Sequence, residues 1–217
     1  MSQAGTSTSR VSKREALEAA LLDAAEMLFG SRSVEAVSMR EIAVAAGTSN
    51  HFAVQHYFNT KDELIRAIFR RRAVSIEGQR AERLDALRRS GRGESARGLL
   101  EVLFLPVIEE LDHHGNRSYA RFLLGVMWAH PYMQLRDEMN ELFPVSNEVM
   151  ALIVEAVPHL TEELFAARIS ASATLFLQAS LHWDHGGGSW QSAYRDFDEA
   201  VADAMSMAVA ALEAPVG

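Results

Sequence analysis

Apolar residues recur along most of the chain at intervals of three and four, the spacing that gives an α-helix one hydrophobic face. The first such segment predicts a helix over residues 12–29, with Gly30 able to end it. Its apolar face is formed by Leu17, Leu21, Ala25 and Leu28. Alternating β-branched runs between turn residues are scarce, so almost no sheet is expected. The pattern predicts an all-α fold.

Helix starts are marked three times by a Ser or Thr followed three residues later by Glu, at 12–15, 38–41 and 60–63. In such a capping box the hydroxyl and the carboxylate bind backbone N–H groups that have no partner inside the helix. The helices predicted to follow the first one cover residues 39–46, 49–56 and 60–89.

The rest of the chain is also predicted to be helical, with prolines dividing it. Pro106 is expected to kink or break a helix at 95–111. Pro144 is expected to kink or end the helix that starts near Pro131, and Pro158 to limit the next one. The other predicted elements are a turn at 113–116 and helices at 118–129, 161–183 and 191–213.

Composition narrows the functional classes. With 217 residues, 48% of them hydrophobic and 23% charged, the chain is expected to fold as one domain or as a small one joined to a larger one. The absence of cysteine excludes disulfides, thiolate metal sites and a cysteine nucleophile. No apolar run reaches roughly 18 residues, and residues 1–11 do not resemble a secretory signal. We therefore expect a cytoplasmic protein with no membrane contact, and no cofactor is indicated.

Charge is unevenly distributed along the chain. The net charge is −8, yet residues 1–72 hold ten Lys and Arg against eight Asp and Glu. A mildly basic N-terminal third on an acidic remainder places any contact with a polyanion near the N-terminus.

The segment from the second predicted helix through Gly47 to the third has the form of a helix-turn-helix motif. Glycine reaches a positive φ at little cost, as a tight turn requires, and Val54 is expected to hold the third helix against the others. The third helix would enter a major groove about 12 Å wide. The side chains expected to face base edges and phosphates are Ser49, Asn50, His51, Gln55 and His56. Lys61, at the start of the next helix, is suited to a phosphate.

Residues 21–68 resemble the DNA-binding domain of TetR-type transcriptional repressors. The matching pieces are Leu22–Ala25, Leu28–Phe29, Ser38–Ala43, Ala46–Gly47, Tyr57–Phe58 and Lys61–Leu64. Ser38, Arg40 and Tyr57 lie in these pieces and join the expected DNA contacts. The resemblance implies a two-domain, all-helical protein that dimerises through its last two helices. It also implies binding to a palindromic operator in double-stranded DNA and a small-molecule pocket in the C-terminal domain.

The expected domain organisation has four parts. They are a flexible tail at 1–11, a three-helix helix-turn-helix DNA-binding domain at 12–60, a connecting helix at 61–89, and an effector-binding and dimerisation domain at 90–217. The chain departs from the family pattern in one place, because Gly47 to Phe58 spans eleven steps where members commonly have ten. Phe52 also stands where many members have a small residue, which leaves open which side chains reach bases.

Residues 122–143 are rich in aromatic side chains and methionine. Such a segment usually forms core, but a ligand pocket also needs apolar walls with a few polar groups. We expect an apolar pocket for a small, apolar effector between the segments that Pro106 and Pro131 interrupt. Its expected contacts are Phe104, Phe122, Met127, Trp128, His130 and Tyr132.

The two last predicted helices are apolar on more than one side, which indicates burial on more than one side. A twofold-related copy of the same two helices would complete a four-helix bundle. The residues expected at this homodimer interface are Phe176, Trp183, Phe197, Val201, Ala204 and Met205. The alternative is that both helices are central to the monomer.

Two charged or polar clusters carry weaker signals. The run Arg70–Arg72 favours a solvated helix face over a phosphate contact. His182 and His185 have a spacing that a metal ion can use, but no third ligand is placed, so no metal site is predicted. No catalytic residue is assigned, since nothing indicates a hydrolase scaffold.

Three functions compete at this point. The favoured one is a ligand-responsive DNA-binding regulator, a repressor released from its operator by the effector. The second is a helical enzyme or small-molecule carrier whose N-terminal helices are only structural. The third is a DNA-binding protein regulated by a protein partner, with a filled core in place of a pocket.

Overall fold

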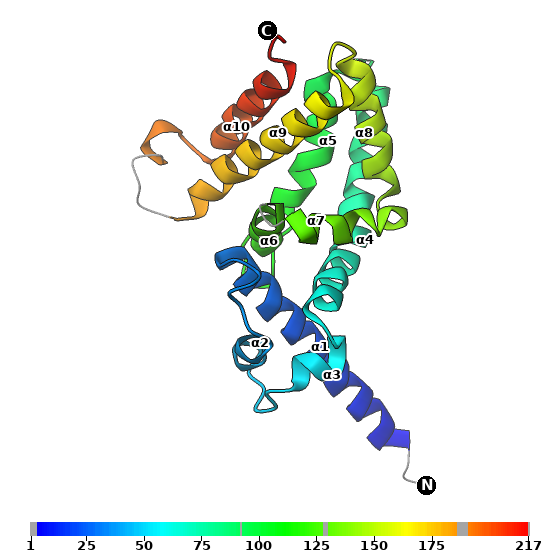
Figure 1. Ribbon diagram of the computed structural model, residues 1–217, viewed down its shortest axis with the longest axis vertical. Helices are drawn as coiled ribbons and strands as arrows, with labels where there is room; N and C mark the ends of the chain where they lie inside the picture. Colours follow the sequence, from blue (N-terminus) through cyan, green and yellow to red (C-terminus); the bar gives the residue numbers. More distant parts are fainter. Residues whose placement is uncertain (1–3, 92, 128–129, 186–190, 217) are drawn as a thin grey trace.

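The computed structural model describes residues 4–91, 93–127, 130–185 and 191–216, and every regular element in these ranges is a helix (Figure 1). The all-α prediction is confirmed. The N-terminal head consists of α1 (Ala4–Ser31), α2 (Met39–Ala45) and α3 (Ala53–Phe58). Helix α4 (Lys61–Arg89) leads from the head into the body. The body also contains α5 (Ala96–Glu109), α6 (Ser118–Met127), α7 (His130–Asp137), α8 (Pro144–Ala156), α9 (Glu162–His182) and α10 (Phe197–Glu213). Short 3-10 helices lie at Asn140–Leu142, Trp183–His185 and Gln191–Ala193.

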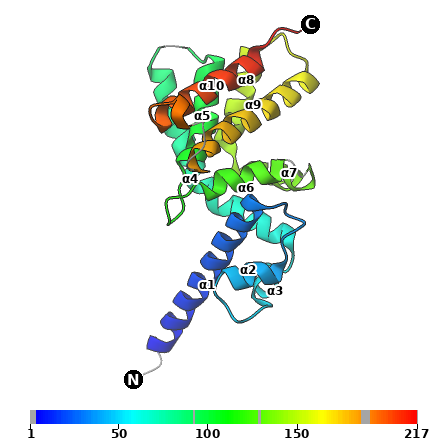
Figure 2. The same cartoon turned by 90° about the vertical axis from the view of Figure 1, so that its left-hand side faces the viewer.

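The molecule is elongated, with the head at one end and the C-terminus at the other (Figure 1). Helices α6 and α7 cross between the head and the rest of the body, while α4 runs along one side of it. Figure 2 shows α9 and α10 lying side by side as an outer layer of the body. The body is therefore connected to the head mainly through α4 and α6.

Side-chain caps fix several helix starts where the sequence predicts them. The hydroxyls of Thr60, Ser95 and Thr161 each accept a hydrogen bond from a backbone N–H in the first turn of α4, α5 and α9. Pro144 occupies the first turn of α8, where its missing N–H costs nothing. Local chemistry therefore sets most boundaries in the body.

Helix α1 begins earlier than expected. It starts at Ala4, so residues 4–11 lie in the helix where a tail was expected. The capping box expected at 12–15 does not form, because the N–H groups at these positions lie inside a continuing helix and need no side-chain partner.

Two predictions for the body also need correction. Helix α5 is not broken at Pro106, whose carbonyl accepts a hydrogen bond from the N–H of Glu110. Burial of Leu103, Phe104 and Val107 on either side keeps the segment in one helix despite the missing donor. Helix α10 begins at Phe197 and not near residue 191, with Asp196 as its N-cap.

The head meets the body where α1 crosses α6. A Cβ atom on Gly30 would lie 2.7 Å from Cβ of Arg121, and one on Gly125 would lie 2.6 Å from the carbonyl oxygen of Phe29. Both distances are too short for any side chain, so each glycine permits the other helix to approach. Gly30 therefore serves this crossing; it does not end α1, which continues to Ser31.

A buried carboxylate lies beside this crossing. Glu26 on α1 is fully buried and receives two hydrogen bonds from Arg72, of 2.6 and 2.9 Å, and one of 3.2 Å from Arg71. The Ser118 hydroxyl, on α6, also donates to it. Arg72 in turn binds Glu110 at the end of α5 (2.9 Å). One carboxylate thus joins α1, α4 and α6.

Two residues of the arginine run at 70–72, Arg71 and Arg72, therefore lie neither on a solvated face nor at a phosphate site. Arg71 and Arg72 turn inward and pair with the buried carboxylate of Glu26. Burial lowers the pKa of Arg72, but its bonds to Glu26 and Glu110 outweigh that effect and raise the pKa above its ordinary value. Arg70 alone stays half exposed, 3.9 Å from Glu63.

We predict that Glu26→Gln lowers the free energy of unfolding by about 3 kcal/mol, because it removes the buried negative charge that Arg71 and Arg72 share and leaves each with one remaining acidic partner, Asp23 or Glu110. The matched control is Glu138→Gln, which removes an exposed partner of Arg66 and should cost less than about 1 kcal/mol. Urea denaturation followed by circular dichroism measures both. Equal losses in the two variants would contradict the role given to Glu26.

Candidate nucleic-acid interface and internal cavity

Helix α2 begins with the capping box predicted at 38–41. The Ser38 hydroxyl accepts a hydrogen bond from the N–H of Glu41 (3.2 Å), and the Glu41 carboxylate accepts one from the N–H of Ser38 (2.8 Å). The backbone bond from Ser38, with smaller contributions from its hydroxyl and Arg32, lowers the pKa of Glu41 to about 2. Ile42 and Ala43 are buried, so α2 is fixed at its start and along its inner face.

The turn after α2 is longer than predicted. Gly47 has the expected positive φ, 74°, but α3 starts at Ala53 and not at Ser49. The Asn50 side-chain oxygen accepts a hydrogen bond from the N–H of Phe52 (3.0 Å), which gives the backbone a turn in place of a helix. Ser49, Asn50 and His51 therefore lie in the turn that precedes α3.

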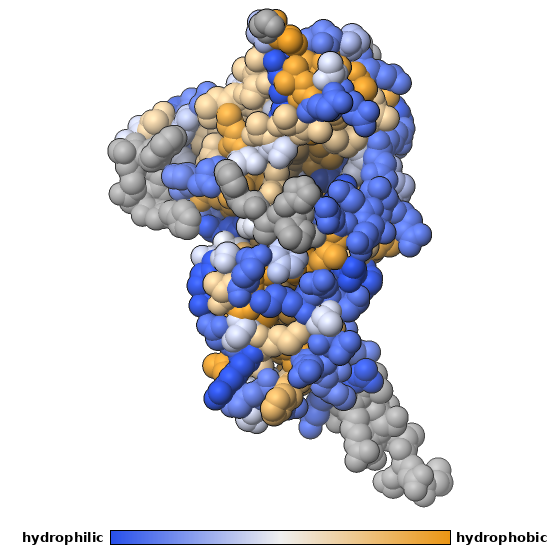
Figure 3. All heavy atoms as spheres, in the orientation of Figure 1, coloured by the Kyte–Doolittle hydropathy of each residue, from blue (hydrophilic) through white to orange (hydrophobic). Residues whose placement is uncertain are grey.

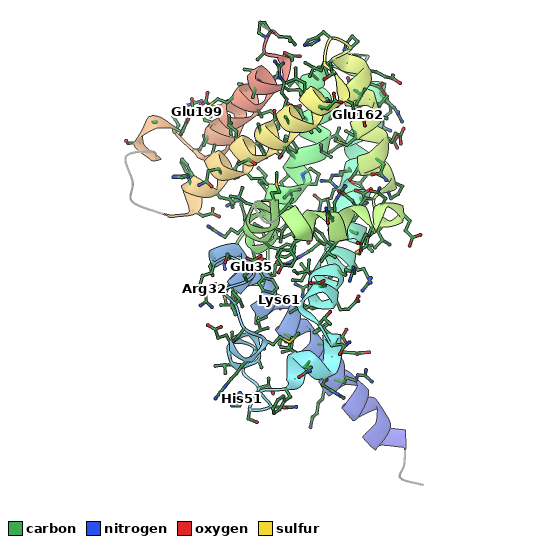
Figure 4. All side chains as sticks on the ribbon, viewed as in Figure 1. Arg32, Glu35, His51, Lys61, Glu162 and Glu199 are labelled. Carbon is green, nitrogen blue, oxygen red and sulfur yellow. The ribbon has the colours of Figure 1, made fainter. Side chains whose placement is uncertain are left out.

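Helix α3 has one buried and one exposed face. Ala53 and Val54 are fully buried and Phe58 nearly so, which confirms the predicted inward position of Val54. Figure 4 shows His51 at the outer tip of the head, away from the body. The predicted DNA-contacting residues that are exposed are Arg40, Ser49, Asn50, His51, Gln55 and His56, together with Ser38, whose hydroxyl is engaged in the cap.

Lys61 is placed differently from the expectation. Its ammonium donates a 2.8 Å hydrogen bond to the carbonyl oxygen of Val34. In Figure 4 it lies near Arg32 and Glu35 and not beside His51. The lysine thus ties the start of α4 to the loop after α1, and we remove it from the proposed phosphate contacts.

Tyr57 is only partly exposed. Its ring makes an edge contact with His56, 5.6 Å between centroids, and the guanidinium of Arg14 lies 5.8 Å from the ring centre. Tyr57 therefore supports the exposed face of α3 from the side of α1.

Phe52 also belongs to this exposed surface, although it was not among the predicted DNA contacts. Its side chain is 73% exposed at the N-cap of α3, between His51 and the exposed Gln55. An exposed aromatic ring at a helix-turn-helix surface can pack against the methyl group of thymine. The departure of residue 52 from the small residue of the family pattern was the signal that pointed to it.

A comparison with protein families matches residues 21–68 to the family described as "Bacterial regulatory proteins, tetR family". The match runs from α1 through α2, the turn and α3 into the first two turns of α4. The chain is a TetR-family regulator. It is accordingly a DNA-binding transcriptional regulator with an N-terminal helix-turn-helix domain. No curated protein matches the chain.

The body of this TetR-family regulator holds a cavity of about 960 Å³. Helices α4 to α9 all contribute to its walls, and this volume is typical of a site for a small organic molecule. Asp137 and Glu162 line it and are exposed, so the cavity reaches the surface; Figure 4 shows Glu162 at the far end of the body. Its apolar lining includes Phe69, Leu103, Phe104, Leu123, Met127, Phe143, Met150, Val157, Leu160, Phe165, Ile169 and Ala173.

The residues predicted to contact an effector fall into three groups. Phe104 and Met127 line the cavity. Phe122 is fully buried but packs against Phe29 and Phe69, with centroids 6.4 and 5.4 Å apart, on the head side of α6. It is excluded from the cavity because α6 turns residues 119, 123 and 127 toward it instead.

Tyr132 also lies outside the lining. Burial raises the pKa of its hydroxyl, as do the negative charges of Glu35 and Asp62, which belong to the head side of the molecule. Trp128 and the side chain of His130 fall outside the described residues.

One end of the cavity is polar. Arg80, 7% exposed, donates to Glu77 (2.9 Å), to Ser146 (2.6 Å) and to the carbonyl oxygen of Leu103 (2.7 and 3.1 Å). Burial raises the pKa of Glu77, but the hydrogen bonds from Ser146 and Arg80 outweigh it and leave the pKa below its ordinary value. The pair therefore stays ionised and anchors α8 to α4.

Half of the predicted dimer contacts lie inside the chain itself. Phe176, Ala204 and Met205 are buried where α9 packs on α5 and α10, and Phe176 stacks on Phe104 with centroids 5.4 Å apart. Trp183 and Phe197 are partly buried against each other, with centroids 6.2 Å apart. Val201 is also partly buried. The burial of Phe176, Ala204 and Met205 therefore fits the alternative prediction, in which both helices are central to the monomer.

We predict that Gln55→Ala and His56→Ala each weaken binding to the DNA site by about 1–3 kcal/mol, the range for one lost base contact. Fluorescence anisotropy with labelled duplex from the DNA flanking the gene measures the affinity. The control is His159→Ala, an exposed histidine after α8, which should leave the affinity unchanged. Full affinity in both α3 variants would show that another surface contacts the bases.

Proposed function

We propose that this regulator is a cytoplasmic, homodimeric repressor that leaves a palindromic operator when a small molecule with an apolar body fills the cavity. Two helix-turn-helix units in a dimer would read two half-sites on one face of the duplex. The observation that carries the proposal is that one helix, α6, lies between the cavity and the head.

The two faces of α6 are occupied by different parts of the molecule. Tyr119, Leu123 and Met127, four residues apart, line the cavity. Ser118 and Phe122 lie on the other face and contact Glu26 and Phe29 of α1. The side chains on this face are tightly packed at the glycine crossing, so α6 has little room to move without α1.

A ligand acts through such a helix only if it binds two arrangements of the protein with different affinity. A molecule bound in the cavity would occupy the space between α6, α5 and α9. A shift of α6 would carry α1 and change the spacing of the two recognition helices in a dimer. The operator and the ligand would therefore each favour a different position of α6, so that binding of one weakens binding of the other.

We predict that Ala173→Trp imitates a bound effector, because Ala173 lines the cavity and an indole would occupy part of it. Operator affinity should fall at least about tenfold, a coupling of about 1.4 kcal/mol. Fluorescence anisotropy measures the affinity, and sedimentation and thermal unfolding check that the variant remains a folded dimer.

The matched control is Ala151→Trp, on an exposed position of α8. It should bind the operator as the unmodified protein does. Unchanged affinity in a folded Ala173→Trp variant would favour a carrier or enzyme in which the cavity has no influence on the head.

The outer face of α9 and α10 supports the dimer. Helix α9 is long and apolar enough to cross a membrane by length and composition, yet only 28% of its apolar window is buried in the single chain. In Figure 3 weakly to strongly hydrophobic residues form a broad band over this part of the body, whereas the head is mostly hydrophilic. A second copy of the chain would cover this apolar face, and the resulting twofold symmetry would match a palindromic operator.

This interface uses different residues from those predicted by sequence. The exposed or partly exposed positions that face outward are Ala167, Ala171 and Leu175 on α9 and Ala202, Ser206, Met207 and Ala210 on α10. Small side chains at most of these positions permit close approach of helices. They replace Phe176, Ala204 and Met205 as the proposed contacts.

We predict that Ala171→Arg converts the dimer to a monomer of 24.0 kDa and weakens operator binding, since one half-site alone binds weakly. Analytical ultracentrifugation at micromolar concentration measures the mass. Ala151→Arg, an exposed alanine on α8, is the control and should remain dimeric. A monomeric unmodified protein would refute the proposed interface.

A further inference from the structure

Tyr119 has an unusual position in the wall of the cavity. Its side chain is only 4% exposed and lines the cavity from α6. Its hydroxyl has no hydrogen-bond partner among the residues that the structure describes. Buried tyrosine hydroxyls ordinarily have a partner, because leaving one unpaired costs free energy. The cavity is thus the direction from which a partner can come.

Burial keeps this hydroxyl protonated, so it acts as a hydrogen-bond donor. Burial raises the pKa of Tyr119 to about 12, against the opposing effects of Arg80 and Arg136, so the hydroxyl keeps its proton at neutral pH. Both arginines line the same cavity. Among the charged groups that act on the hydroxyl, Arg80, Arg136 and Arg72 are positive and Glu26 is negative.

Arg80 has one N–H group that is not used in the hydrogen bonds described above. A guanidinium carries five N–H groups, and Arg80 makes four hydrogen bonds to protein acceptors, which leaves one N–H of Nη2 without an acceptor in the described part of the chain. The guanidinium of Arg136 lies 4.8 Å from the ring centre of Phe143 and 3.3 Å from the carboxylate of Asp137. This end of the cavity therefore offers donors in excess of acceptors.

The carboxylate of Glu77, which pairs with Arg80, is already engaged. Both oxygens of Glu77 accept bonds, from Arg80 and the Ser146 hydroxyl on one side and from the N–H groups of Val145 and Ser146 on the other. The wall beyond Phe143 is apolar, formed by Val157, Leu160 and Ile169. The cavity thus has a donor-rich end and an apolar remainder.

We propose that the effector is an amphipathic acid, with its carboxylate accepting hydrogen bonds from Tyr119 and Arg80 beside Arg136, and its apolar body lying along α8 and α9. This inference rests on the proposed function only in calling the ligand an effector. The binding itself is a property of the cavity and can be measured without DNA.

The test uses three probes with the same chain and different head groups: decanoate, 1-decanol and decylammonium. Isothermal titration calorimetry on the intact dimer measures each dissociation constant at neutral pH. Decanoate should bind at least about tenfold more tightly than decanol, the usual margin of a charge-assisted hydrogen bond over a neutral one, and decylammonium least tightly.

Two variants assign the effect to residues. Tyr119→Phe removes only the hydroxyl and should weaken decanoate binding about tenfold. Arg136→Gln should reduce the preference for decanoate over decanol while leaving the decanol affinity nearly unchanged. Tyr132→Phe is the matched control, because Tyr132 lies outside the cavity, and it should leave all three affinities unchanged.

Three results of the binding measurements would count against the proposal. Decanol or decylammonium binding as tightly as decanoate overturns the acidic head group, and unchanged decanoate affinity in Tyr119→Phe overturns its position. Absence of saturable binding for all three probes overturns the amphipathic ligand. Tight decanoate binding with no effect on operator affinity would instead keep this inference and reject the proposed function.

Discussion

The buried carboxylate of Glu26 is the constraint on which the arrangement of head and body depends. A carboxylate without solvent is stable only when its charge is compensated and its oxygens are hydrogen-bonded. Arg71 and Arg72 of α4 and Ser118 of α6 meet that need, and no other donors of the described residues do so. The angle between α1 and these helices is therefore fixed by charge pairing as well as by packing.

The crossing of α1 and α6 follows from the same junction. Gly30 and Gly125 let the two backbones approach more closely than any side chain allows, and Phe122 fills the space beside them. Close contact makes the crossing stiff, because protein interiors have almost no free volume through which one helix could move alone. The cavity lies on the opposite face of α6, so it borders directly on this close crossing.

Much of the local structure could be predicted from the sequence. The capping box at 38–41, the Thr60 cap of α4 and the positive φ of Gly47 involve residues only a few positions apart, so their chemistry is visible without the fold. The exposed side of α3 was also predicted in large part, because Val54 sets which side faces inward. The start of α3 was not, since the Asn50 side chain favours a turn over a first helical turn.

The sequence by itself determined the helical class and the helix-turn-helix, because periodicity, caps and motif spacing are local properties. Only the tertiary structure decided which partner each side chain meets. It directed Lys61 to the Val34 carbonyl, Arg72 to Glu26 and Phe122 to the head side of α6. It also placed Phe176 and Ala204 inside the subunit and Tyr119 in the cavity wall. The physical reason is that an apolar or charged side chain only requires some complementary surface, and packing across the whole chain selects which surface that is.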